Sequence, residues 1–128
     1  MTKEQFIKYC NITDDQFSGR EKIEGNLNLV DLTSIPEGFN PKVGDGLYLN
    51  RLTSIPEGFN PVVGGILNLN SLTSISEGFS PVVGGKLLLG SLTEIPENWN
   101  PTNINENIHI GRFIFDIKTT IKFMNFEI

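Results

Sequence analysis

Apolar residues recur along the chain with a fixed spacing. The ten-residue stretch LTSIPEGFNP occupies positions 32–41 and returns unchanged at 52–61. Altered copies, LTSISEGFSP and LTEIPENWNP, occupy 72–81 and 92–101, so the period is 20 residues. Such a period is typical of stacked repeats, in which each unit buries its apolar face against its neighbours. The pattern therefore predicts a solenoid over the middle of the chain.

Each unit opens with a short stretch in which apolar and polar residues alternate, as they do in a strand with one buried face. These stretches begin at Leu27, Leu47, Leu67 and Leu87, with a final half-unit at Ile108. Pro-Glu-Gly and Gly-Gly then predict two bends in each unit. Stacking of equivalent positions predicts two columns across the coils, an aromatic column of Phe39, Phe59, Phe79 and Trp99 and a polar column of Asn40, Asn60, Ser80 and Asn100.

Residues 1–24 have the pattern of a helical N-terminal cap. TKEQ at 2–5 and TDDQ at 13–16 both read as capping boxes that open a short helix. Phe6, Tyr9 and Cys10 fall at helical spacing and predict one apolar face. Helices this short need a surface to pack against, so we expect them to cover the open end of the first coil.

The segment 112–128 departs from the repeat and predicts a C-terminal β cap. It contains two alternating apolar runs, with a turn expected at 118–120; the apolar residues are Phe113, Phe115, Ile117, Met124, Phe126 and Ile128. This cap either packs on the last coil or forms an interface with a partner or a second copy. The whole chain is expected to form a single domain, 1–128, with the repeats at 25–111.

An L-x-L strand followed by LTSIPEGF resembles the short bacterial type of leucine-rich repeat, over residues 27–110. The resemblance implies protein binding rather than catalysis. Asn50 and Asn70 are offset from the usual asparagine position of that family, and Gly90 replaces asparagine altogether. These differences favour a flatter coil with strands on two sides over the standard horseshoe. We therefore expect a mainly β fold, a leucine-rich-repeat-like β-solenoid of four to five coils.

Composition narrows the classes of function. The 128 residues carry a formal net charge of −5, with 20% charged residues and a single cysteine. Phosphate backbones require clustered Lys and Arg, so nucleic acid is not expected as a direct partner, and a basic protein surface is the better complement. No apolar run is long enough for a membrane span and no leader is visible, so we expect a cytoplasmic protein without a membrane partner.

Residues suited to catalysis are few. His109 is the only histidine and points outward in the repeat, while Cys10 is expected on the buried side of the first helix. Neither has a sequence neighbour that would complete a catalytic pair or a metal site. The chain is therefore expected not to be an enzyme and to need no metal and no cofactor.

Two surface stripes are candidates for binding. The first is an acidic ladder of copied turn residues, Glu37, Glu57, Glu77 and Glu97. The second is a set of outward strand positions at which the repeats differ: Tyr48, Asn50, Arg51, Asn68, Asn70, Leu88, His109 and Arg112. Tyrosine and arginine are frequent anchors of protein interfaces. The competing interpretations are duplication of a solvated turn residue for the first stripe and drift of an unconstrained face for the second.

The sequence thus favours a non-enzymatic protein-binding module. A specific version is an inhibitor of a basic nucleic-acid-handling enzyme, such as an anti-CRISPR or another phage counter-defence protein. The alternative is a scaffold that self-associates as a homodimer through its C-terminal strands.

Overall fold

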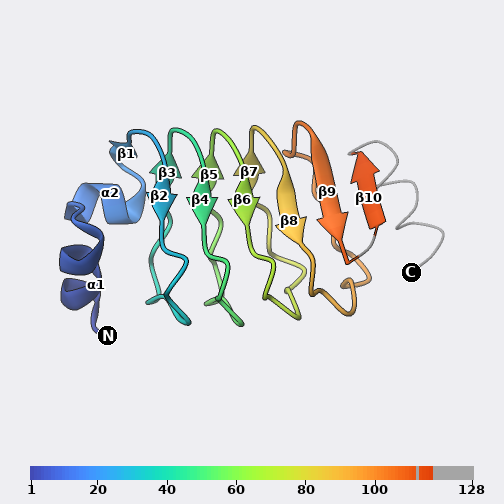
Figure 1. The fold of residues 1–128 in the computed structure, drawn as a ribbon, viewed down its shortest axis with the longest axis horizontal. Helices are drawn as coiled ribbons and strands as arrows, with labels where there is room; N and C mark the ends of the chain where they lie inside the picture. The colour runs from blue at the N-terminus through green and yellow to red at the C-terminus, as the bar shows by residue number, and fades with distance from the viewer. Residues whose placement is uncertain (112, 117–128) are drawn as a thin grey trace.

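The chain forms a β-solenoid of about four turns with two short helices at one end (Figure 1). The structure, a computed structural model, describes residues 1–111 and the backbone of 113–116. Helices α1 (Lys3–Cys10) and α2 (Asp14–Ser18) precede the strands. The expected turn at 118–120 and the second C-terminal strand lie outside the described residues.

Strands lie on two sides of each coil. One side is a four-stranded parallel sheet of β1 (Lys22–Ile23), β3 (Lys42–Val43), β5 (Val62–Val63) and β7 (Val82–Val83). The other is a six-stranded sheet of β2 (Leu27–Asn28), β4 (Leu47–Tyr48), β6 (Leu67–Asn68), β8 (Leu87–Leu89), β9 (Asn107–Ile110) and β10 (Phe113–Asp116). The predicted β-solenoid is confirmed, and its coils have strands on two sides, as expected for the flatter form. The strands β3, β5 and β7 were not predicted individually.

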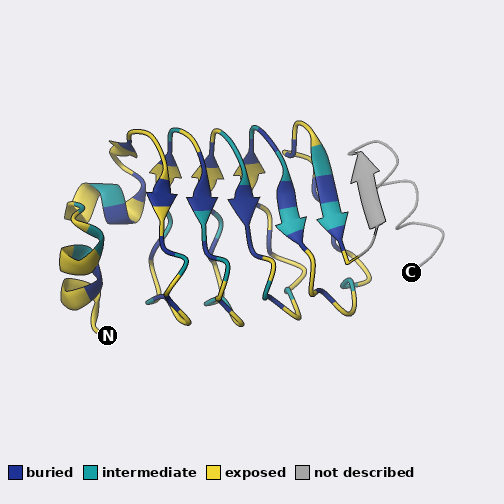
Figure 2. Cartoon of the chain, viewed as in Figure 1, coloured by how far each residue is buried: buried dark blue, intermediate teal, exposed yellow. Residues whose placement is uncertain are grey.

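The core lies between the two sheets and continues beneath the Pro-Glu-Gly bends (Figure 2). Equivalent leucines fall in register, so that Leu47 pairs with Leu67 and Leu67 pairs with Leu87. All three are fully buried, as are Leu49, Leu69 and Leu89 two positions later. Each apolar layer is thus covered by the coil before it and the coil after it, which is how a stack of short units becomes stable.

The two helices close the first end of the solenoid, as predicted. Both capping boxes form, with Thr2 and Thr13 each accepting the backbone N–H of a glutamine three residues later. Phe6 and Phe17 pack edge-on and tilted against Phe39 of the first coil, at ring centroid distances of 4.7 and 5.5 Å. Tyr9, expected on the buried face, is 53% exposed, whereas Phe6, Ile7 and Cys10 form the side of α1 that packs against the core.

The Gly-Gly bends hold the coils at close range. Gly44, Gly64 and Gly84 form a column in which each N–H donates to a carbonyl of the preceding coil, at 2.8 to 2.9 Å. A Cβ added to Gly64 would overlap the carbonyl oxygen of Gly44, and one added to Gly84 would overlap that of Gly64. Glycine is required here by the approach of neighbouring backbones rather than by a positive φ.

The predicted polar column forms a ladder of hydrogen bonds over its first members. Asn40 Oδ1 accepts the backbone N–H of Asn60 at 2.6 Å, and Asn60 Oδ1 accepts that of Ser80 at 2.6 Å. The ladder stops at Ser80, whose shorter side chain makes no such bond to Asn100 among the described contacts. Two coil junctions are therefore tied by asparagine side chains at this bend.

Asn60→Ala is expected to lower the free energy of unfolding by about 1 kcal/mol, because it leaves the Ser80 N–H without its 2.6 Å partner. Urea unfolding followed by the fluorescence of Trp99, the only tryptophan, measures the change. Asn100→Ala serves as the control, since it occupies the same repeat position without a bond to a following coil in the described structure. Equal losses for both variants would show that the ladder does not stabilise the stack.

The predicted aromatic column is broken in the middle. Phe39 stacks on Phe59 at a centroid distance of 6.2 Å, and Phe79 stacks on Trp99 at 6.4 Å. Phe59 and Phe79 form no such pair, although both are described and buried. The column therefore consists of two pairs, and its continuity was wrongly predicted. The break lies between the second and third copies of the ten-residue stretch.

The last coil ends in an antiparallel strand. β9 pairs in parallel with β8, and β10 then pairs antiparallel with β9 in the register Phe113 with Ile110. The expectation of a β element after the repeats is confirmed for Phe113–Asp116.

Candidate binding surfaces

The varied positions of the first strand form one row across the six-stranded sheet. Strand register places Asn28 beside Tyr48, Tyr48 beside Asn68, Asn68 beside Leu88, and Leu88 beside His109. We call these five residues the varied row. Their strand neighbours point into the core, so the row occupies the outer face of the sheet. The structure thus brings four predicted site residues, Tyr48, Asn68, Leu88 and His109, onto one surface.

Tyr48 lies flat against this face because Gly46 precedes it by two positions. A Cβ at position 46 would come within 2.7 Å of three atoms of the Tyr48 side chain. The equivalent positions of the next coils are Ile66 and Lys86, which would not admit the ring. Gly46 therefore sets the orientation of Tyr48. It was not predicted as a site residue, although the glycine two positions before an outward aromatic residue was visible in the sequence.

The asparagines of the candidate face are partly used by the fold itself. Asn68 is only 8% exposed, and its Oδ1 accepts the N–H of Asn70 at 3.1 Å. Asn70 Oδ1 in turn accepts the N–H of Gly90 at 2.9 Å, which ties the third coil to the fourth. Asn50 is half-buried; its backbone carbonyl oxygen accepts the Ser71 hydroxyl, while its side-chain Oδ1 is buried with no hydrogen-bond partner among the described residues. The side chains of Asn68 and Asn70 shape the exit from the strands, and Asn70 remains exposed.

The groups most available to a partner are the larger side chains. Arg51 is exposed, and Tyr48, Leu88 and His109 are half-buried. Tyr48 and Leu88 offer a phenol and an aliphatic group on the outer sheet face, and Arg51 offers a cation in the turn after β4. His109 Nε2, by contrast, is buried with no hydrogen-bond partner among the described residues. Arg112, also predicted for this surface, lies outside the described residues.

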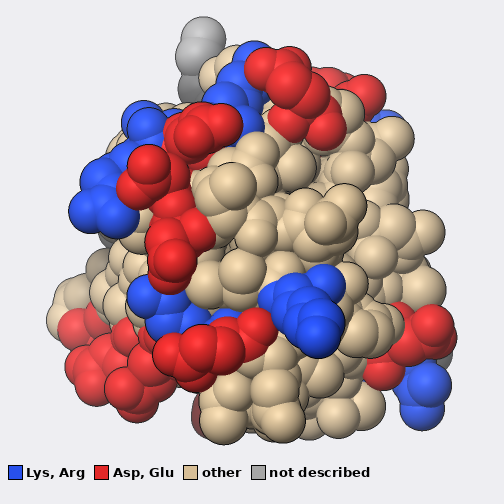
Figure 3. All heavy atoms as spheres, turned by 90° about the vertical axis from the view of Figure 1, so that its left-hand side faces the viewer, with Lys and Arg blue, Asp and Glu red and all other residues tan. Residues whose placement is uncertain are grey.

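The acidic ladder runs along the Pro-Glu-Gly bends, and all four of its members are exposed: Glu37, Glu57, Glu77 and Glu97. None of them pairs with a cation within residues 1–111. The ion pairs formed there lie on the helical cap, between Lys3 and Asp14 at 3.3 Å and between Arg20 and Asp15 at 2.8 Å. Figure 3 shows acidic and basic side chains interspersed on the face that carries this cap. Within residues 1–111 the ladder therefore carries four carboxylates that form no ion pair.

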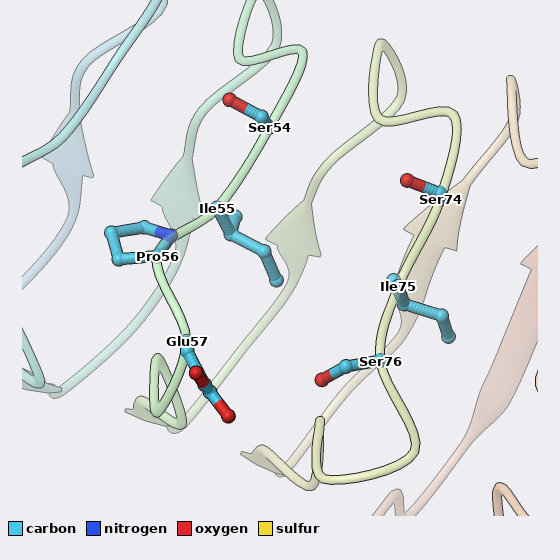
Figure 4. Close-up of a pocket in the computed structure, with 7 residues that line it drawn as sticks. All are labelled: Ser54, Ile55, Pro56, Glu57, Ser74, Ile75 and Ser76. Carbon is cyan, nitrogen blue, oxygen red and sulfur yellow. The ribbon is translucent and has the colours of Figure 1, made fainter.

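A groove opens between the second and third bends, where the aromatic column is broken. It consists of two adjoining hollows of about 380 and 430 Å³. Ile55, Pro56 and Glu57 line both hollows on one side, and Ser76 lines both on the other. Figure 4 shows Ile55 projecting from one loop toward the next, with Ser76 projecting back. The sequence did not predict this groove.

A change of turn geometry accompanies the groove. In every copy, the N–H of Phe39 or its equivalent donates to the carbonyl of the residue three positions earlier, which defines a β-turn. Gly38 and Gly58 have φ of 87° and 83°, as a type II turn requires at its third position. Gly78 has no positive φ, and Ser76 replaces the proline found at position 56. The two loops that flank the groove thus differ in conformation.

The four-stranded sheet presents a second outer row that sequence reasoning missed. Register places Lys22, Lys42, Val62 and Val82 side by side. Val62 and Val82 are 37% and 42% exposed, whereas the valine after each is buried. The signal in the sequence was the Pro-x-Val pattern, in which two residues per strand were too few to reveal a period of two.

Chemistry at the titratable groups is limited. Burial raises the pKa of the Cys10 thiol to about 11, so it stays protonated near neutral pH and is a poor nucleophile. Among the described residues, no group of three His, Cys, Asp or Glu side chains could hold a metal ion. None of the described helices is long and apolar enough to cross a membrane.

The fold and surfaces define a short β-solenoid with a capped first end. No protein-family model matches the chain, and neither the curated proteins nor the solved structures contain a significant match.

Proposed function

We propose that the chain is a non-enzymatic protein-binding module that docks through the outer face of its six-stranded sheet. The observation that carries the proposal is the varied row, a line of five adjacent positions in register on the outer face, of which only Asn68 is buried. The inward positions of the same strands are copied as leucine or isoleucine. Contrast between a constant core and a variable outer row is the arrangement expected of a scaffold tuned for one partner.

The anchors of this surface are Tyr48 and Arg51. Aromatic residues and arginine supply most of the hot spots of protein interfaces. Tyr48 is held flat by Gly46, so little conformational entropy is lost when a partner covers its ring. Arg51 follows the same strand and is exposed. Tyr48 supplies an apolar plate, and Arg51, three positions later in the chain, supplies a cation.

The acidic ladder, which forms no ion pair within residues 1–111, and the net charge of −5 support a basic partner. Within the proposal, the specific version is an inhibitor of a basic nucleic-acid-handling enzyme, of the anti-CRISPR or other counter-defence type. Kinship with the short bacterial leucine-rich repeats belongs to the same proposal. It rests on the LTSIPEGF stretches and their 20-residue period. The proposal also includes a cytoplasmic location for the protein.

Tyr48→Ala/Arg51→Ala is expected to weaken capture of the partner by at least about tenfold, because it removes both anchors. The measurement is pull-down from a bacterial lysate with the immobilised chain, followed by identification and quantification of the captured protein. Lys42→Ala/Val62→Ala is the matched control, since it truncates two exposed neighbours on the opposite sheet. It should retain full capture.

A charge-reversal variant, Glu57→Lys/Glu77→Lys, separates the two candidate surfaces in the same assay. Loss of capture by the charge-reversal variant alone would move the docking surface to the acidic ladder, and unchanged capture by the Tyr48/Arg51 variant would contradict the proposal. If the captured protein is a second copy of the chain, self-association through the C-terminal strands replaces it.

A further inference from the structure

The groove between the second and third bends lies where neighbouring copies of the repeat differ in conformation. Three differences coincide there: the aromatic column breaks between Phe59 and Phe79, the turn geometry changes between Gly58 and Gly78, and Ser76 replaces proline. The coils nevertheless stay joined nearby, since Asn60 still bonds to the next coil. The opening is therefore confined to the loops.

The walls of the groove combine apolar and hydrogen-bonding surface. Ile55, Pro56 and Ile75 are half-buried and line the smaller hollow, and Ile55 projects across it (Figure 4). Phe59 and Phe79 line the larger hollow. Three serines add hydroxyl groups that can accept hydrogen bonds: Ser54, Ser74 and Ser76. A ligand for this site needs an apolar stem and several donors.

Charge restricts the ligand further. Glu57 lines both hollows and Glu77 lines the larger one, whereas no Lys, Arg or His lines either. Both carboxylates are exposed and make no ion pair within residues 1–111. Arginine fits this combination, because its methylene stem packs on apolar walls and its five N–H donors can bridge two carboxylates or a carboxylate and hydroxyls.

We infer that this groove receives an arginine side chain from an extended segment of a protein partner. The stem would lie along Ile55, with the guanidinium at Glu57 and Glu77. Glu37 and Glu97, which occupy the equivalent position in two other bends, line neither hollow. The inference rests on the proposed protein-binding function but concerns a different surface from the varied row.

The test uses the peptide Gly-Arg-Gly-Arg-Gly, blocked at both ends, titrated into the ¹⁵N-labelled full chain at low salt. Saturable chemical-shift changes are expected at the amides of 54–59 and 74–79. The same peptide with citrulline in place of arginine keeps the shape and loses the charge, and should produce no saturable change. Glu57→Gln/Glu77→Gln should weaken binding by about tenfold, since it removes charge-assisted hydrogen bonds.

Glu37→Gln/Glu97→Gln is the matched control, because it removes the same charge from the same repeat position outside the groove. It should bind the peptide within about twofold of the wild type, given the screening of exposed charges. Equal weakening by both variants, or binding of the citrulline peptide, would overturn the inference. Absence of saturable changes would overturn it too, and loss of capture by the Tyr48/Arg51 variant would then leave the proposed function standing.

Discussion

Gly64→Ala is expected to lower the free energy of unfolding by about 3 kcal/mol, at the upper end for overpacked sites. The added methyl group would overlap the carbonyl oxygen of Gly44, which is backbone and cannot rotate away. Relief requires the coils to separate, and separation would lengthen the bond from the Gly64 N–H to Val43, now 2.9 Å. Urea unfolding monitored by Trp99 fluorescence measures the loss.

Gly78→Ala is the matched control for that variant. Gly78 has no positive φ, and the nearest atom to an added Cβ is the Ser76 hydroxyl oxygen at 4.0 Å. This change should alter the free energy of unfolding by no more than about 0.5 kcal/mol. A small effect of Gly64→Ala, similar to that of Gly78→Ala, would contradict the close stacking of the bends.

Leu89→Ala is expected to lower the free energy of unfolding by about 2 to 5 kcal/mol, the range for truncating a fully buried leucine. Leu89 has no exposed surface and pairs with Ile110 of the last coil. The cavity would lie between coils, so it would weaken the junction on both sides of β8. The same urea assay measures the change.

Leu88→Ala tests the opposite face of the same strand. Leu88 is half-buried on the varied row, and its removal should cost no more than about 1 kcal/mol. Equal losses at the two adjacent leucines would mean that β8 does not alternate between core and binding face.

The architecture was predictable wherever a signal was repeated. The 20-residue period predicts the stack of coils, the alternating leucines predict which strand positions face the core, and the two capping boxes predict where the helices begin. The strands of the four-stranded sheet were not resolved individually, because Lys42–Val43 and its equivalents are two residues long. These short strands are defined only by their hydrogen bonds to neighbouring coils, and the sequence of one unit does not reveal that pairing.

The break in the aromatic column shows that residues at the same position of the repeat do not always stack on one another. Ser76 was visible in the sequence as a departure from proline, yet its consequence depends on the turn that Glu77 and Gly78 adopt. Glycine is compatible with both signs of φ, so the turn type is decided by packing between the loops. The groove could therefore not be read from the sequence.

The candidate face was predictable as a set of positions but not in its detail. Alternation placed Tyr48, Leu88 and His109 outward, and their register makes them neighbours. Asn68 was also expected to be available, but its side chain turns back to the N–H of Asn70 and is nearly buried. Short polar side chains after a strand often bond to the local backbone, and this competes with a role in binding.

The central claim is that the partner binds to the outer face of the six-stranded sheet, at the positions where the repeats differ. The most direct measurement is the dissociation constant of the purified partner for the wild-type chain, for Tyr48→Ala/Arg51→Ala, and for Lys42→Ala/Val62→Ala. The account predicts at least about tenfold weaker binding for the first variant and unchanged binding for the second. Equal affinity of all three chains would contradict it.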